Sequence, residues 1–164
     1  LVSQQQWDKV QCLIQAGIDE GAVLLAGGTG KPVGLETGYY AKPTLFGSVN
    51  NRMRIAREEI FGPVLVLIPF TTEEEAIAIA NDTPYGLGAY LSTGDLQYGR
   101  RIARQLKAGT VHINGAALEY TMPFGGYKQS GNGREYGVYG IHDFQEIKAI
   151  SGYYADSVPC KTVI

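Results

Sequence analysis

Residues 64–114 read VLVLIPFTTEEEAIAIANDTPYGLGAYLSTGDLQYGRRIARQLKAGTVHIN, and the pattern of this stretch sets the expected architecture. The dense apolar run at 64–70 predicts a strand buried on both faces. Further strands are expected at 87–92 and 110–114, with a helix before each. The order strand, helix, strand, helix, strand with short connections predicts parallel strands. We therefore expect an α/β fold: a partial, open, mainly parallel sheet with flanking helices, whose ligands bind beyond the strand carboxyl ends.

Local signals mark where the helices begin. Thr72 and Glu75 have the spacing of a capping box, and Asp95 is a good N-cap for the next helix. Ser3 and Gln6 have the same spacing at the start of the chain. Apolar residues then recur at helical spacing, namely Trp7, Val10, Ile14 and Ile18.

Two strands and a glycine-rich region complete the expected organisation. Residues 23–26 form a short apolar run, and a second strand is expected at about 39–46, where Pro43 suggests an edge position or an irregularity. Residues 123–140 are rich in glycine, and an extended segment is expected at 147–154.

Composition excludes several classes of protein. The chain has 164 residues, 45% of them hydrophobic, which suits one compact domain or a large piece of one. A net charge of -2 gives no basic excess for nucleic acid or an anionic membrane surface. There is no run of ~18 apolar residues to span a bilayer. Cys12 and Cys160 make no disulfide framework, so we expect a reducing, cytoplasmic location. The start, Leu1-Val2-Ser3, resembles an internal position of a longer chain.

Two glycine patterns resemble phosphate-binding loops but lack their context. Residues 27–31 (GGTGK) look like the end of a P-loop, but Leu25 stands where its first glycine belongs and Pro32 follows the lysine. Residues 131–137 resemble a loose dinucleotide fingerprint, but no apolar strand precedes them. Both are interpreted as structural turns.

No catalytic or metal-binding set is recognisable from the residues alone. Cys12 lies in the amphipathic first helix, where a free cysteine is usually an inert small hydrophobe. His112 and His142 have no metal-ligand spacing to another histidine or cysteine. Asn114 at a strand end is expected to make a turn. Glu58 and Glu59 are either solvated or place one carboxylate where it accepts both hydroxyls of a ribose diol.

Four motifs in order resemble the aldehyde dehydrogenase family. They are residues 58–64 (EEIFGPV), 81–87 (NDTPYGL), 108–114 (AGTVHIN) and 123–135 (PFGGYKQSGNGRE). The likeness runs from residue 1 to about 154. It implies a partial catalytic domain at 1–144, followed by an oligomerisation strand and tail at 145–164 through which a homo-oligomer would form.

The resemblance implies a reaction in which a cysteine thiolate attacks an aldehyde and hydride passes to NAD or NADP. A glutamate then helps water to release the carboxylic acid. These residues and the oxyanion-hole asparagine would lie before Leu1, so no catalytic residue is assigned here and the chain alone is expected to be inactive. The alternative is a non-catalytic assembly or interaction module derived from an aldehyde dehydrogenase.

Some binding residues can be carried over by the resemblance. Glu59 would hold the nicotinamide ribose, and Phe61 would pack near the nicotinamide. Gln6 and Lys9 would lie near the adenosine ribose, although Gln6 could instead serve the capping box and Lys9 could be solvated.

On the substrate side, Phe124 resembles a wall of the substrate tunnel. Glu135 resembles a glutamate linked to proton movement, or alternatively makes an ion pair or a cap. The loop at 115–122 would contact the aldehyde and differs among family members according to substrate.

Overall fold

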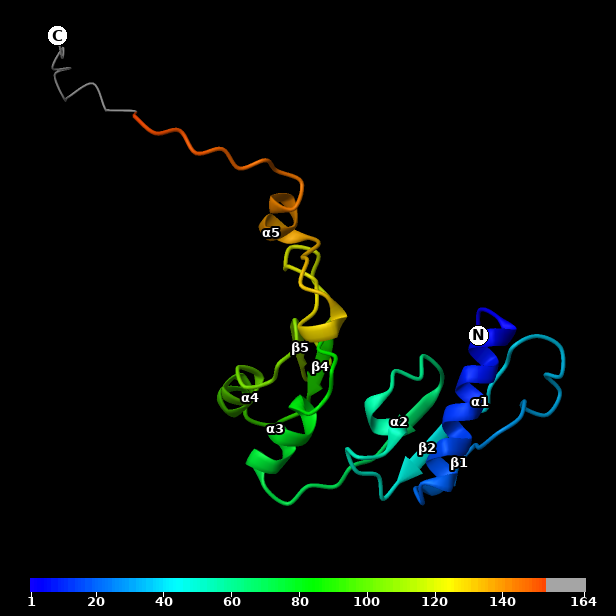
Figure 1. The fold of residues 1–164 in the computed structure, drawn as a ribbon. Coiled ribbons are helices and arrows are strands. Elements are labelled where there is room, and N and C mark those ends of the chain that lie inside the picture. Colours follow the sequence, from blue (N-terminus) through cyan, green and yellow to red (C-terminus); the bar gives the residue numbers. More distant parts are fainter. Residues whose placement is uncertain (153–164) are drawn as a thin grey trace, which may run out of the picture.

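The computed structural model describes residues 1–152, which form two groups of elements joined by residues 67–72 (Figure 1). The N-terminal group holds α1 (Gln4–Asp19), β1 (Val23–Ala26), β2 (Thr44–Gly47), α2 (Arg54–Arg57) and β3 (Val64–Val66). The C-terminal group holds α3 (Glu73–Asn81), β4 (Gly88–Leu91), α4 (Leu96–Ala103), β5 (Thr110–Ile113), the 3-10 helix η1 (Lys128–Ser130) and α5 (Gly137–His142).

The predicted helix starts are confirmed. The hydroxyl of Ser3 accepts from the Gln6 backbone N–H at 3.2 Å. The hydroxyl of Thr72 accepts from the backbone N–H of Glu75 at 3.2 Å, and Asp95 caps α4 in the same way. Each cap satisfies backbone donors that have no partner within the first helical turn.

The core of the N-terminal group lies between α1 and its sheet. Val10 and Ile14 of α1 and Phe46 of β2 are fully buried, as the helical spacing predicted for the two helix residues, whereas Ile18 at the end of the same pattern is exposed. Ile55 of α2 joins them against Gly17, where an added Cβ would lie only 2.8 Å from the Ile55 Cδ1 atom. A fully buried side chain of this size contributes roughly 1.5–3 kcal/mol, so this small cluster anchors the N-terminal group.

The strand that follows Pro43 is central, so the edge alternative was wrong, whereas an irregularity is present as a register shift between Leu24 and Ala26 of the paired strand. β2 pairs antiparallel with β1 and parallel with β3. Pro43 lies just before the first paired residue, Thr44, so its missing N–H does not interrupt the ladder.

The single continuous sheet predicted over 64–114 is also corrected. β4 and β5 pair in parallel across α4, as predicted, but they form a separate two-stranded sheet. β3 ends at Val66, and Pro69 soon after it has no N–H to continue a ladder. Its side chains are not buried on both faces, since Leu65 is 62% exposed. Only one face is covered: Val64 and Val66 pack against the core, whereas Leu65 points to the opposite face.

The C-terminal strand is not seen. After α5, residues 143–152 extend away without forming a strand (Figure 1). The last two residues of the predicted 147–154 segment, and Cys160, lie outside the described residues. Among the helices of residues 1–152, none has both the length and the apolar character needed to cross a bilayer.

Candidate functional site

The turn at residues 58–63 connects α2 to β3 and carries two of the predicted binding residues. Phe61 lies in the left-handed region with φ 57°, a conformation that is strained for an aromatic residue. Gly62 follows it and packs on α1, where an added Cβ would lie 2.6 Å from a methyl group of Val10. The sequence Phe-Gly therefore lets this turn lie directly on the helix.

Side chains of α1 hold the backbone of this turn. The Gln6 amide donates to the carbonyl oxygens of Ile60 and Phe61 at 3.0 and 3.1 Å. The Lys9 ammonium donates to the carbonyl oxygen of Glu59 at 2.7 Å. The four residues predicted to bind cofactor are thus brought together. Gln6 contributes its backbone N–H to the cap and its side chain to the turn, and Lys9 is not simply solvated.

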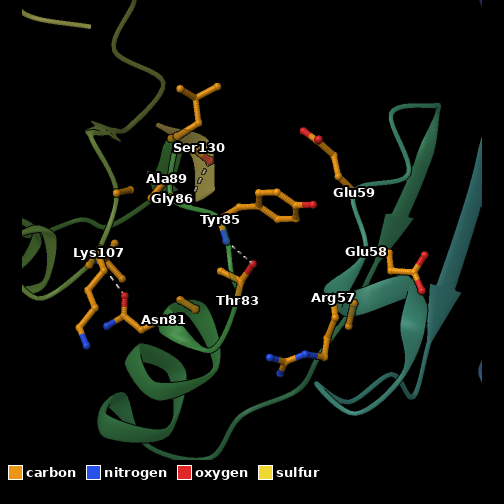
Figure 2. Close-up of a pocket in the computed structure, with 16 residues that line it drawn as sticks. Arg57, Glu58, Glu59, Asn81, Thr83, Tyr85, Gly86, Ala89, Lys107 and Ser130 are labelled. Carbon is orange, nitrogen blue, oxygen red and sulfur yellow. Dashed lines mark hydrogen bonds between the residues drawn. The ribbon is translucent and has the colours of Figure 1, made fainter. Parts of the chain in front are cut away.

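The two neighbouring glutamates have different surroundings. Glu58 pairs with Arg54 at 2.7 Å, and the hydrogen bond from this guanidinium lowers the pKa of the Glu58 carboxyl. In Figure 2 its carboxylate points away from the space between the two groups, whereas that of Glu59 points into this space. Phe61 is 73% exposed. Glu59 and Phe61 therefore extend their side chains from a backbone that α1 holds in place.

A cavity of about 340 Å³ lies between the two groups. Glu59 lines it from the N-terminal group, and the ring of Tyr85 points toward the glutamate side from the C-terminal group (Figure 2). Its other lining residues come from both groups and include Ala56, Arg57, Glu58, Asn81, Thr83, Gly86, Leu106, Lys107 and Ser130.

Polar contacts set the separation of the two groups at this cavity. Arg57 pairs with Asp82 at 3.0 Å, and this hydrogen bond lowers the pKa of the Asp82 carboxyl. The Asn51 amide donates to the Ile79 carbonyl oxygen at 3.0 Å. Sequence reasoning missed Arg57 and Asp82, because nothing in a charged surface residue indicates a partner 25 positions away.

The backbone of one residue, Gly86, is hydrogen-bonded to residues of two other sequence motifs. Its carbonyl oxygen accepts from Gly109 at 3.0 Å and from Tyr127 at 2.9 Å, while its N–H donates to the Ser130 hydroxyl at 3.0 Å. Lys128 adds two hydrogen bonds from its ammonium, to the carbonyl oxygens of Asn81 and Thr83. The sequence analysis did not predict these contacts. The only indication of them in the sequence was that the glycines and the lysine belong to the four motifs.

Phe124 and Glu135 form a second cluster. They face each other in an antiparallel bridge, with reciprocal backbone hydrogen bonds of 2.7 Å. Both line another cavity of about 390 Å³, together with Arg134 and Phe144. Glu59 does not line this cavity, so the structure separates the predicted cofactor and substrate residues into two places.

His112 and Asn114, to which the sequence analysis gave no catalytic or metal-binding role, make structural contacts. His112 stacks on Tyr90 with 4.8 Å between ring centroids, and its Nδ1 lies 2.7 Å from the Ala116 carbonyl oxygen. Asn114 lies in a turn that the Ala116 N–H closes by donating to the Ile113 carbonyl oxygen at 3.2 Å. Its side chain also links this turn to Thr93, accepting from the Thr93 N–H at 2.8 Å and donating to the Thr93 carbonyl oxygen at 2.9 Å.

Comparison with known proteins identifies similar chains. The sequence pattern of the aldehyde dehydrogenase family matches residues 1–150. A 3-succinoylsemialdehyde-pyridine dehydrogenase from a Pseudomonas species is 60% identical over 153 residues, which are 93% of this chain and 32% of the relative.

Solved structures agree in fold. Aldehyde dehydrogenase C of Pseudomonas syringae, a mutant in complex with NAD+ and octanal, has a TM-score of 0.92 and 51% identity, covering 96% of this chain and 33% of that one. A Mycobacterium tuberculosis aldehyde dehydrogenase in complex with NAD+ has a TM-score of 0.87 and 47% identity, covering 94% and 32%. The chain therefore spans about a third of the length of these relatives.

Proposed function

Because the chain belongs to the aldehyde dehydrogenase family, we propose that it supplies the nicotinamide-ribose contacts and one wall of the aldehyde site in an NAD(P)-dependent oxidation of an aldehyde to a carboxylic acid. One observation carries the proposal: the Glu59 carboxylate points into the cavity between the two groups, from a turn held by α1 (Figure 2). The NAD+ bound in the similar structures makes this cofactor the first to test.

The chemistry of Glu59 suits a ribose. A carboxylate accepts hydrogen bonds from both hydroxyls of a diol, and each such bond to a charged group contributes roughly 1.5–3 kcal/mol. Gln6 and Lys9 hold the turn before ligand arrives, which lowers the entropy cost of binding. The exposed ring of Phe61 then covers an apolar face of the nicotinamide.

Gln6 and Lys9 are proposed as supports of the turn first and as adenosine-ribose contacts second. The amide of Gln6 is already engaged with two carbonyl oxygens. The Lys9 ammonium has three donors, of which Glu59 takes one, so it can also reach a hydroxyl of the adenosine ribose.

On the aldehyde side, Phe124 is proposed as a wall of the substrate site and Glu135 as a group that moves protons. Residues 1–164 hold no assigned nucleophile, so the chain alone is proposed to be inactive. Assembly with a second copy through residues 145–164 is also proposed. Its support is the exposure of Ile147 and Ile150, which are 94% and 80% exposed.

A chimera tests the cofactor proposal. In it, this chain replaces the matched third of the Pseudomonas relative, and NADH formation is followed with the semialdehyde for which that relative is named. Glu59→Gln should raise the KM for NAD+ about tenfold, the equivalent of roughly 1.4 kcal/mol. Glu58→Gln is the matched control, and it should change this KM less than about twofold because its ion pair is half exposed.

Equal effects of the two substitutions would contradict the assignment of Glu59. The 164-residue chain is assayed beside the chimera with the same semialdehyde and NAD+. It should form no NADH above the blank, and steady NADH formation by the chain alone would refute its proposed inactivity.

A further inference from the structure

We propose that Tyr136 determines substrate specificity, and that the aldehyde site prefers substrates carrying an aromatic ring over linear aliphatic ones. The inference rests on the proposed function of Phe124 and deepens it, since it assigns a residue and a substrate class that the sequence motifs left open. It starts from three aromatic rings that the fold gathers from separate segments.

Backbone hydrogen bonds bring these segments together. The bridge between Phe124 and Glu135 fixes the residue next to Tyr136 against the start of the glycine-rich region. The Gly137 N–H donates to the carbonyl oxygen of Tyr120 at 3.3 Å, which ties the variable 115–122 loop to the same place. Tyr136 is therefore flanked on both sides by residues whose backbone is held.

Tyr136 is the middle ring of the three. Its centroid lies 5.1 Å from that of Tyr120 in an edge-to-face arrangement with an interplanar angle of 85°. It lies 6.1 Å from the Phe124 centroid at 43°. Both separations fall in the range of attractive aromatic pairs, so Tyr136 connects the proposed tunnel wall to the variable loop.

The backbone holds Tyr136 in an unusual conformation. Its φ is 62° and its ψ is 168°, a combination that essentially only glycine adopts. Gly137 also has a positive φ, 57°, and a Cβ there would lie 2.7 Å from the Thr121 carbonyl oxygen. The backbone at Tyr136 and Gly137, which sets the direction of the Tyr136 Cα–Cβ bond, is thus closely constrained.

The cluster offers aromatic surface to a ligand. Tyr120 is 70% exposed and Tyr136 is 42% exposed, while Phe124 is partly buried. The nearby Arg134 guanidinium is occupied by the carbonyl oxygens of Gly126, Asn132 and Gly133. A flat ring can form edge-to-face or offset contacts with two of these rings at once, whereas an alkyl chain gains only buried area.

The test compares benzaldehyde with hexanal in the same chimera. Tyr136→Asn removes the ring and keeps a Cβ atom, so the backbone strain at φ 62° and ψ 168° stays as it is in the parent chain. The ratio of kcat/KM for benzaldehyde to that for hexanal should fall about tenfold. Tyr136→Phe should keep the ratio within about twofold, because the ring contacts remain.

The matched control is Tyr139→Asn, which removes an exposed tyrosine of α5 that stacks on His142 outside the cluster. It should leave the ratio unchanged. A parallel loss with both aldehydes in Tyr136→Asn, or an unchanged ratio, would overturn the inference while leaving the proposed function intact. An unsubstituted chimera that oxidises neither aldehyde nor the semialdehyde would instead overturn the proposed function, and the inference with it.

Discussion

Replacing Gly62 with alanine should press the turn that carries Glu59 and Phe61 against helix α1. The new Cβ would lie 2.6 Å from one methyl group of Val10 and 3.2 Å from the other. Carbon atoms in favourable contact are ~3.5–4.0 Å apart, so one side must shift by about 1 Å. Val10 is fully buried and cannot swing out to solvent. Overpacking of this kind costs roughly 1–3 kcal/mol of unfolding free energy.

A second substitution separates this clash from any other effect of alanine. Val10→Ala removes both methyl groups and should cost about 2–3 kcal/mol alone, from lost burial and the cavity left behind. In the double variant the methyl group introduced by Gly62→Ala occupies part of that space. The combined loss should therefore be smaller than the sum of the single losses by about 1–2 kcal/mol.

Urea unfolding followed by tryptophan fluorescence gives the unfolding free energy of the parent chain, the two single variants and the double variant. The signal reports on α1, because Trp7 is the only tryptophan of the sequence. In the chimera, Gly62→Ala should also raise the KM for NAD+, and Val10→Ala should restore part of it. Strictly additive losses, or a Gly62→Ala variant as stable as the parent chain, would refute the reasoning from packing.

Three further predictions follow from the contacts between elements. Arg57 lowers the pKa of the Asp82 carboxyl below the ordinary value of 3.8, so this pair stabilises the fold above that pH and the contribution disappears as pH falls through the folded pKa. In the Asp82→Asn variant, the unfolding free energy should therefore decrease less as the pH is lowered through the acidic range. Gly109→Ala should cost about 3 kcal/mol or more in urea unfolding, because a Cβ would overlap the Gly125 carbonyl oxygen. Lys128→Met should cost about 1.5–3 kcal/mol by the same measurement, because it removes both hydrogen bonds to the end of α3 and the turn after it, whereas an unchanged midpoint would contradict the role of that ammonium.

Features that depend on neighbouring residues were predictable. Ser3, Thr72 and Asp95 each bond to backbone N–H groups two or three positions away, so the cap is complete within one turn of helix. The buried face of α1 follows in the same way from helical spacing. The parallel pairing of β4 and β5 across α4 was also correct, because a short strand-helix-strand connection leaves few alternatives.

The residues of the candidate site were predicted from the sequence, but the contacts that hold them were not. Resemblance placed Glu59 and Phe61 near a ligand, but the hydrogen bonds from Gln6 and Lys9 that hold their turn span 50 to 55 positions. The middle position of Tyr136 between Phe124 and Tyr120 could not be predicted from the sequence either, because it depends on a backbone bridge and a positive φ.

Capping and amphipathic spacing are short-range chemistry, and the order of residues alone determines them. Strand partners are chosen by closing long loops and by the burial that results, and these energies depend on the whole chain. That is why only the folded structure could show that β2 is central, that the expected sheet is divided in two, and that the carboxylates of Glu58 and Glu59 point in different directions.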